Sequence, residues 1–132
     1  MNTSKLNFNS FGEGFPDAKG IYYIIGVDKV GNVIPINRIC GTDTDGVLYI
    51  GESGCIQDRI GYFIKTILPN YKTDCHSGGK MYCCSEPIRI MFPKENLLVK
   101  YELCEDHVER ELELIQNYIQ KFGELPPLNS QS

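Results

Sequence analysis

The strongest constraint on the fold is the longest apolar run of the chain, Gly20–Val27. The run reads GIYYIIGV, and its aromatic and β-branched side chains are typical of a buried β-strand. Its eight residues fall far short of the roughly 20 that a membrane-spanning helix needs. The first residues, MNTSKLNFNSFGEG, contain no basic region followed by an apolar stretch, which is the pattern of a secretory signal. We therefore expect a cytoplasmic protein built around this strand, with no membrane partner.

The segments that follow this run predict a three-strand antiparallel meander. Residues 29–32 (KVGN) form a turn signal, and Val33–Ile39 can return antiparallel to Gly20–Val27. A polar loop over 41–46 leads to a short apolar segment, Val47–Ile50, which we expect to be the third strand. The sheet is thus predicted to begin with three consecutive strands.

A helix is predicted after the third strand, between Ser53 as its N-cap and Pro69 as its end. Its apolar residues fall on one face: Ile56, Ile60, Phe63, Ile64 and Ile67. Residues 70–86 are mostly polar and contain two consecutive glycines, so they predict a loop or flap. Two more strands are expected at Ile88–Phe92 and Leu97–Cys104.

The last predicted element is a helix that begins near Asp106 and ends at Gly123. Asp106 and Glu109 have the spacing of a capping box. Apolar residues recur at helical spacing and predict a face that packs on the core: Val108, Leu112, Ile115, Ile119 and Phe122. Gly123 suits a helix C-terminus, and Pro126-Pro127 prevents the helix from continuing.

Together these elements predict an α+β fold. We expect a single compact domain in which a central antiparallel sheet, made of the meander and the later strands, is packed with helices. Residues 1–19 have no clear periodicity and predict an irregular N-terminal arm. The folded domain then occupies 20–129, and residues 130–132 form a short tail.

Charge is unevenly distributed along the chain. The formal net charge of −4 and the pI of about 5.1 argue against a protein that coats nucleic acid non-specifically. Residues 59–94, however, carry six basic and two acidic side chains. This segment is either a docking site for an anionic partner or a set of solvated surface lysines.

The six cysteines of the chain permit two interpretations. Because no export signal is visible, we expect free thiols rather than disulfides. The chain has no paired CxxC motif, but Cys75, His76, Cys83 and Cys84 are grouped in the sequence. A zinc-stabilised interaction protein is therefore one alternative.

Five polar residues interrupt the apolar patterns at places that the predicted fold can bring together: Tyr22, Tyr49, Arg59, Glu111 and Asn129. Arginine side chains bind phosphate oxygens, and a carboxylate can hold Mg²⁺. A tyrosine can orient an attacking water, or accept its proton when nearby cations lower the tyrosine pKa. Each of these residues also has an ordinary structural explanation, so the residues alone indicate an α+β domain with a candidate anion site.

The joint pattern of these positions resembles the GIY-YIG nuclease superfamily. The segments GIY (20–22) and LYIGES (48–53) match its two tyrosine motifs, and Arg59 follows in the next helix. The segments RELELI (110–115) and FGELPPLN (122–129) are similar to its glutamate-bearing helix and its closing Pro-Leu-Asn. The resemblance covers nearly the whole chain. The superfamily includes phage homing endonucleases, an incision subunit of nucleotide excision repair and some restriction enzymes.

The resemblance implies a metal-dependent endonuclease that hydrolyses phosphodiester bonds of nucleic acid, DNA rather than RNA. Tyr22 and Tyr49 would flank the scissile phosphate, and one of them, Tyr22 by preference, would activate water. Arg59 would steady the phosphate in the transition state. Glu111 would be the only protein ligand of Mg²⁺ or Mn²⁺, and Asn129 would tie the C-terminal segment to the site.

The chain departs from the family pattern at two places. The separation between Tyr22 and Tyr49 is much longer than is usual in the family, because a hairpin is inserted there. Some members also carry a histidine one helical turn after the arginine, where this chain has Phe63. A base role for a histidine at that position is therefore excluded.

Substrate contacts are expected outside the five motif positions, at Gly51, Lys65, His76 and Lys80. Specificity would come from the inserted hairpin, the basic segment, a homodimer or a partner protein. The alternative is a catalytically silent module on the same scaffold that binds nucleic acid or protein. Retention of all five motif residues counts against that alternative.

Overall fold

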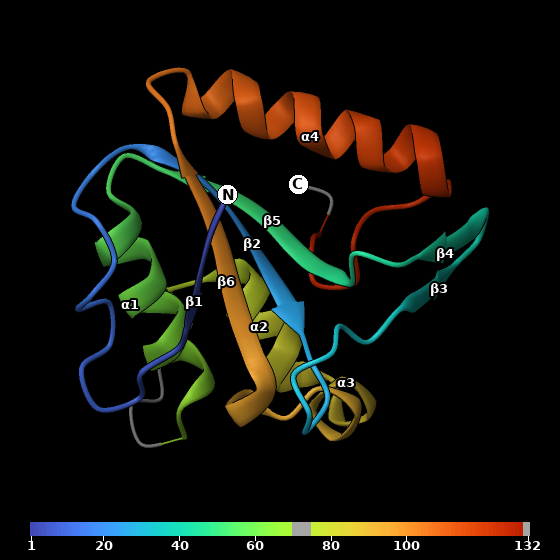
Figure 1. Cartoon of the computed structure of the whole chain (residues 1–132), viewed down its shortest axis with the longest axis horizontal. Helices are drawn as coiled ribbons and strands as arrows, with labels where there is room; N and C mark the ends of the chain where they lie inside the picture. Colours follow the sequence, from blue (N-terminus) through green and yellow to red (C-terminus); the bar gives the residue numbers. More distant parts are fainter. Residues whose placement is uncertain (70–74, 131–132) are drawn as a thin grey trace.

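Strand β2 (Gly20–Gly26) lies at the centre of the sheet in the computed structural model of the chain (Figure 1). It pairs antiparallel with β6 (Leu97–Leu103) on one side and with β5 (Val47–Ser53) on the other. Strand β1 (Asn2–Lys5) pairs with the outer edge of β6, which gives the order β1-β6-β2-β5. The predicted α+β class, a single compact domain with an antiparallel sheet packed with helices, is confirmed.

The structure describes residues 1–69 and 75–130. Within these two ranges, no helix combines the length and the apolar character that crossing a membrane would require.

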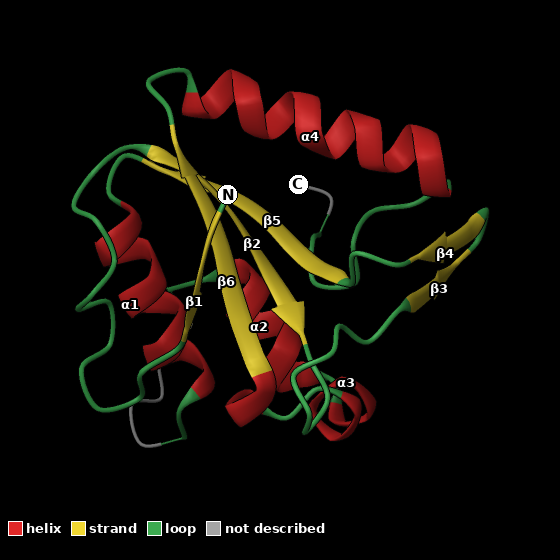
Figure 2. Ribbon diagram, in the orientation of Figure 1, coloured by secondary structure: helices red, strands yellow, loops and turns green. Residues whose placement is uncertain are grey.

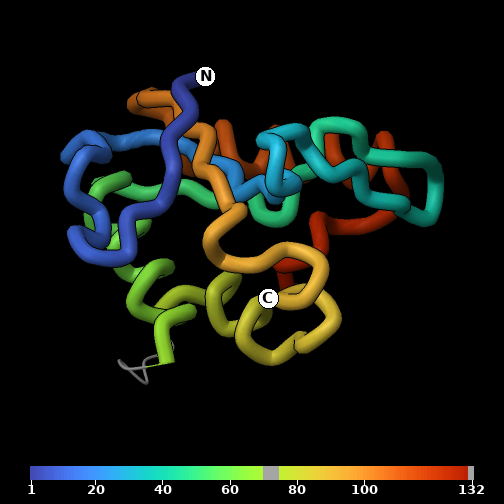
Figure 3. Tube along the Cα trace, turned by 60° about the horizontal axis from the view of Figure 1, so that its bottom comes forward, coloured from blue at the N-terminus to red at the C-terminus, as the bar shows by residue number. Residues whose placement is uncertain are grey.

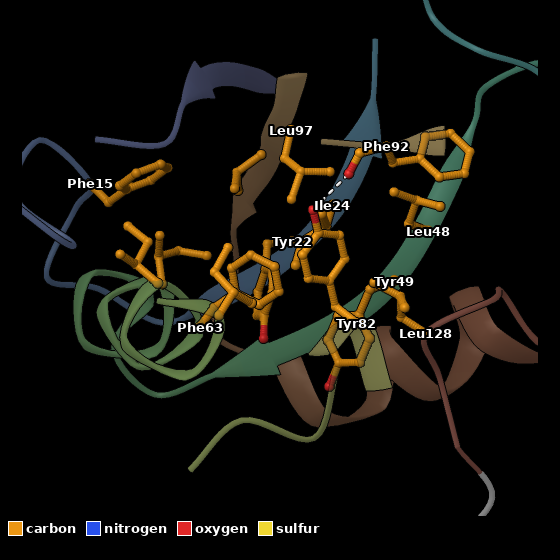
Figure 4. Packing of buried hydrophobic residues seen from close by; sticks show 14 of the residues in the cluster. Phe15, Tyr22, Ile24, Leu48, Tyr49, Phe63, Tyr82, Phe92, Leu97 and Leu128 are labelled. Carbon is orange, nitrogen blue, oxygen red and sulfur yellow. Dashed lines mark hydrogen bonds between the residues drawn. The ribbon is translucent and has the colours of Figure 1, made fainter. Parts of the chain in front are cut away.

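Helices cover both faces of the sheet (Figures 1 and 2). Helix α1 (Ile56–Ile67) and helix α2 (Ser77–Cys84) lie together on one face, and α4 (His107–Phe122) packs against the other. Because successive strand residues point to opposite faces, Ile24 joins the cluster beneath α1 while Ile25 joins the cluster beneath α4. Figure 4 shows the first cluster, in which Tyr22 and Tyr49 of the sheet lie among the buried side chains.

A β-bulge in β5 places its residues on these faces. Ile24 pairs with Tyr49 and Ile25 pairs with Val47, so Leu48 has no partner in β2. Leu48 packs instead in the cluster beneath α1, and its carbonyl oxygen accepts a hydrogen bond of 2.8 Å from the N–H of Leu128. The bulge therefore connects the C-terminal segment to the sheet.

The predicted three-strand meander is wrong. Residues 33–39 do not join the main sheet; β3 (Ile36–Arg38) and β4 (Gly41–Asp43) form a separate two-stranded hairpin instead. Only an isolated bridge between Val27 and Val33 remains of the predicted pairing. Pro35 explains the difference, because a proline has no N–H to donate to a ladder and interrupts a central strand. The hairpin projects at one end of the molecule (Figures 1 and 3).

Asp43 anchors this hairpin to the domain. Its side chain is 1% exposed. One carboxylate oxygen accepts the N–H of Gly46 at 3.1 Å, and the other accepts the N–H of Val47 at 3.0 Å and the hydroxyl of Tyr118 at 2.9 Å. Burial and this bond to Asp43 raise the pKa of Tyr118 above its usual value. One buried carboxylate thus joins the hairpin, β5 and α4.

The N-terminal arm and the segment after α1 contain more regular structure than predicted. Residues 2–5 of the arm predicted over 1–19 form β1, because the free edge of β6 offers unpaired backbone groups. The part of the predicted flap from Ser77 to Cys84 is helix α2, whereas 70–74 lie outside the described residues.

Helix α3 (Glu86–Met91) replaces the strand predicted at Ile88–Phe92, and a 3₁₀ turn at Lys94–Asn96 precedes β6. The side chain of Ser85 caps α3 by accepting the N–H of Ile88 at 3.3 Å, and Pro87 lies in its first turn. These helix-initiating signals outweigh the strand propensity of the isoleucines.

The two long helices begin differently from the prediction. Ser53 is not the N-cap of α1; it ends β5, and its hydroxyl accepts the N–H of Cys55, which is the N-cap. Asp106 is the N-cap of α4 but makes no side-chain capping bond, so the predicted capping box does not form. The predicted end of α4 is confirmed, because Gly123 adopts a left-handed φ of 78°.

The core-facing side of α4 agrees with the prediction only in part. Phe122 is buried against the sheet as predicted, and Ile115 packs against the same cluster. Val108, Leu112 and Ile119, which were also predicted to face the core, are instead 58%, 56% and 39% exposed. Tyr118, which was not predicted, is buried beside Phe122.

Asp43→Ala should destabilise the fold by about 3 kcal/mol, because it removes the acceptor of the Val47 N–H and of the Tyr118 hydroxyl, and the side-chain acceptor of the N–H groups of Asp45 and Gly46. The measurement is the free energy of unfolding in urea. Asp45→Ala is the matched control, since Asp45 is an exposed aspartate two positions away, and its effect should stay within about 0.5 kcal/mol. Equal losses in both variants would show that Asp43 is not the anchor.

Candidate active site

Tyr22 of β2 and Tyr49 of β5 lie side by side on the face of the sheet that carries α1. Tyr22 pairs with Gly51 and Ile24 pairs with Tyr49, so the two tyrosines occupy diagonal positions across the strand pair. Their ring centroids are 5.9 Å apart. Tyr22 is fully buried, and Tyr49 is 7% exposed. The two predicted tyrosines are therefore brought together.

Gly51 makes room for both rings. A Cβ atom on Gly51 would lie 2.6 Å from Cζ and Oη of Tyr22 and 2.7 Å from Cε2 of Tyr49. Any side chain at this position would displace the tyrosines. The structure therefore places Gly51, which was expected to contact substrate, as a buried spacer beneath the tyrosine pair.

His76, the N-cap residue of α2, is the buried partner of Tyr22. The ring is 0% exposed and lies with Tyr49 and Phe63 at centroid distances of 5.1 Å each. Its Nδ1 accepts the N–H of Gly79 at 3.1 Å, so in the neutral ring the proton is on Nε2. Nε2 therefore donates to Oη of Tyr22, at 2.7 Å.

Burial keeps both members of this pair uncharged. Burial, with a contribution from the charge of Arg59, lowers the pKa of His76 to about 3. Burial raises the pKa of Tyr22 well above its usual value, the neighbouring Tyr49 adds to the rise, and Arg59 opposes it. At neutral pH the structure thus holds a neutral imidazole that fixes the position of a protonated tyrosine. His76 was expected to contact substrate from a flap; it lies instead behind Tyr22.

Arg59 of α1 brings a permanent positive charge to the two tyrosines. Its guanidinium lies close enough to the side chains of Tyr22 and Tyr49 to interact electrostatically with both. Nη1 also donates to the carbonyl oxygen of Cys75 at 3.0 Å. Burial lowers the pKa of Arg59, but its contacts with the tyrosines outweigh burial and raise the pKa above its usual value. The guanidinium is therefore both charged and held in place.

Glu111 of α4 approaches the same region from the other side of β5. Burial raises its pKa and the carboxylate of Glu52 adds to the rise, while the backbone N–H of Glu52 and the charges of Arg59 and His107 oppose it. Nδ1 of His107 lies 2.5 Å from Oε2 of Glu52. Glu52 and His107 were not predicted as site residues. The signal was present, because His107 precedes Glu111 by one helical turn and Glu52 follows the second tyrosine motif.

Asn129 holds the C-terminal segment against β5, as expected. Its Oδ1 accepts the N–H of Ile50 and its Nδ2 donates to the carbonyl oxygen of Ile50, both at 2.9 Å. The side-chain amide thus pairs with the free edge of β5 as a neighbouring strand would. The hydroxyl of Tyr49 hydrogen-bonds Oγ of Ser77 at 3.4 Å, which closes the site on the α2 side.

The two lysines that were expected to contact substrate are placed differently. Lys65 of α1 lies over the ring of Phe11 in the N-terminal arm, with its Nζ 5.5 Å from the ring centroid. The structure does not bring Lys65 to the tyrosine pair. Lys80 is exposed on α2, four residues after His76.

The donor chemistry of Glu111 fits the expected Mg²⁺ or Mn²⁺. A half-buried carboxylate that lies next to a second carboxylate is stabilised by a bound cation, and hard divalent cations prefer oxygen ligands. Across residues 1–69 and 75–130, no three or more His, Cys, Asp or Glu side chains are grouped in a way that could hold a metal ion. Both ring nitrogens of His76 are engaged, so His76 is not disposed to bind zinc as the cysteine alternative requires. None of the six cysteines, all of which lie within the described residues, forms a disulfide.

Searches of protein-family models, of curated proteins and of solved structures found no match to this chain. The likeness to the GIY-YIG superfamily therefore stays a prediction from the residues quoted above.

The buried imidazole should make stability depend on pH. His76 binds its proton near pH 6.5 when unfolded but only near pH 3 when folded, so the unfolded chain gains a proton first as the pH falls. Between pH 7 and pH 5 this should remove about 2 kcal/mol from the free energy of unfolding. His76→Gln should abolish that loss, measured by urea denaturation at both pH values.

The matched control for this experiment is the other histidine. His107→Gln should keep the pH-dependent loss of stability because His76 is intact in that variant. A wild-type protein that is equally stable at pH 7 and pH 5 would mean that the imidazole is not held neutral.

Proposed function

We propose that this protein is a metal-dependent endonuclease that hydrolyses phosphodiester bonds of nucleic acid, with DNA as the expected substrate. One observation supports the proposal above the others. The electrostatic neighbours of Tyr22 are Tyr49, Arg59 and Glu111, which come from β5, α1 and α4. Tyr49 and Glu111 also line a groove together with Asn129. Hydroxyls, a guanidinium and a carboxylate around one point are what in-line attack on a phosphodiester requires.

In the proposed reaction Arg59 binds a non-bridging oxygen of the scissile phosphate and offsets the charge that develops there. The hydroxyl of Tyr49, a residue that lines the groove, orients the attacking water, and the buried ring of Tyr22 lies behind it. The water oxygen bonds to phosphorus as one phosphorus–oxygen ester bond breaks, and the net transfer of a proton is from water to the leaving oxygen. Because the hydrogen bond to His76 fixes Tyr22, the ring that supports Tyr49 is positioned before substrate arrives.

Glu111 would hold the divalent ion, which when bound supplies positive charge to the phosphate. A single carboxylate suits Mg²⁺, because this ion keeps most of its water ligands. The contact between His107 and Glu52 fixes the carboxylate that lies beside Glu111. The first turn of α4 and the end of β5 therefore support the proposed metal ligand together.

Glu111→Gln should reduce Mg²⁺-dependent nicking of supercoiled plasmid by at least about 100-fold, because it removes the anionic ligand while it keeps the shape of the side chain. Glu109→Gln is the matched control, since Glu109 is an exposed glutamate in the same helix with the same formal charge. It should retain nearly full activity.

Two results would count against the proposal. Equal nicking by both variants would mean that Glu111 is not the ligand or that the activity belongs to a contaminant. No nicking of plasmid or branched DNA by the folded wild-type protein, with either Mg²⁺ or Mn²⁺, would favour the catalytically silent binding module.

A further inference from the structure

A groove of about 500 Å³ opens directly beside the proposed reaction centre. Its polar side is formed by Tyr49, Glu111 and Asn129, which are three of the five motif residues. Its volume lies in the range of small-molecule sites, roughly 300 to 1,000 Å³. Whatever fills the groove therefore touches the group that reacts.

A second part of the lining, the apolar wall, consists of aliphatic side chains. Leu112, Ile115 and Ile119 of α4 and Leu125 of the C-terminal segment line it. Leu112 and Ile119 are 56% and 39% exposed, although their spacing in the sequence is that of a core-facing stripe. Apolar side chains that surround a cavity at a reaction centre provide a surface for the flat faces of a ligand.

The charge of the groove favours the base of a nucleotide over its phosphate. Among the described residues that line it there is no lysine or arginine, and Glu111 adds a carboxylate. A sugar-phosphate chain running through the groove would meet no cation there, and phosphate contacts depend on basic side chains. A nucleobase is uncharged, flat and weakly polar at its edge, so it matches a lining that combines apolar side chains with polar ones.

We propose that this groove holds an unpaired nucleobase next to the scissile phosphate, and that the substrate is nucleic acid that is unpaired at the cleavage site. The inference rests on the proposed function, because it places the phosphate at Tyr49 and Arg59. The base of a nucleotide is only one sugar away from its phosphate. A phosphate bound at the tyrosine pair would therefore have its base in the adjoining groove, which Tyr49 itself lines. In a duplex the base is stacked and paired, so it enters such a groove only after it leaves the helix.

The test compares binding of three DNA ligands by fluorescence anisotropy, with EDTA present to prevent cleavage. The first is a single-stranded oligothymidylate of about twenty nucleotides, a length that covers one binding site. The second is the same strand with abasic sugars at alternate positions, which has the same phosphate charge. The third is the duplex with oligodeoxyadenylate. The single strand should bind about tenfold more tightly than either of the other two.

Variants of the apolar wall supply an independent arm of the test. Leu112→Ser with Ile119→Ser should reduce the advantage of the intact strand over the abasic strand to less than about twofold. Val108→Ser is the matched control, because Val108 is on the same exposed stripe but does not line the groove. The Val108→Ser variant should bind the intact strand more tightly than the abasic strand by the same factor as the wild-type protein. All three positions are exposed, so these changes spare the core.

The outcomes separate this inference from the proposed function. Equal binding of intact and abasic strands, or a double variant that behaves like Val108→Ser, would overturn the base-binding groove even if the protein nicks DNA. Clear discrimination without cleavage by the wild-type protein in Mg²⁺ or Mn²⁺ would support the groove and refute the nuclease. Absence of binding to all three ligands would overturn the groove.

Discussion

The hydrogen bond between His76 and Tyr22 is the interaction on which the arrangement of the site depends. Both side chains are fully buried, so each needs the other to satisfy a polar atom that water cannot reach. The same imidazole caps α2 through Gly79. One neutral ring therefore connects the central strand, the second tyrosine and α2, and it does so only while it stays uncharged.

The residues of the site come from both faces of the sheet, and they meet at its edge strand, β5. Tyr22, Tyr49 and Arg59 belong to the side that carries α1, whereas Glu111 is on α4 at the opposite face. They meet because β5 is an edge strand around which both helices reach. The side-chain amide of Asn129 pairs with that edge, which also blocks pairing by another strand.

Local patterns were enough to predict the central strands and α1, because each has an apolar pattern of the right period. The end of α4 was predicted from Gly123, because glycine is the residue that most easily adopts the left-handed conformation there. The five motif residues came from a resemblance, and the structure brings them to one region. The role of His76 could not be predicted, because a histidine in a polar, glycine-containing segment gives no sign that it will be buried. The exposed face of α4 was missed because periodicity identifies a stripe but not what covers it.

The acidic character of the chain fits contacts to bases better than contacts to backbone phosphates. Arg59 brings a positive charge to the tyrosine pair, and the described lining of the adjoining groove contains no lysine or arginine. A protein that neutralises few phosphates gains little from counterion release, so its affinity must come from surfaces that nucleobases can cover. In a duplex those surfaces are already covered by stacking. The charge pattern and the exposed stripe on α4 therefore both support the proposed ligand, a nucleic acid with at least one base free to leave the stack.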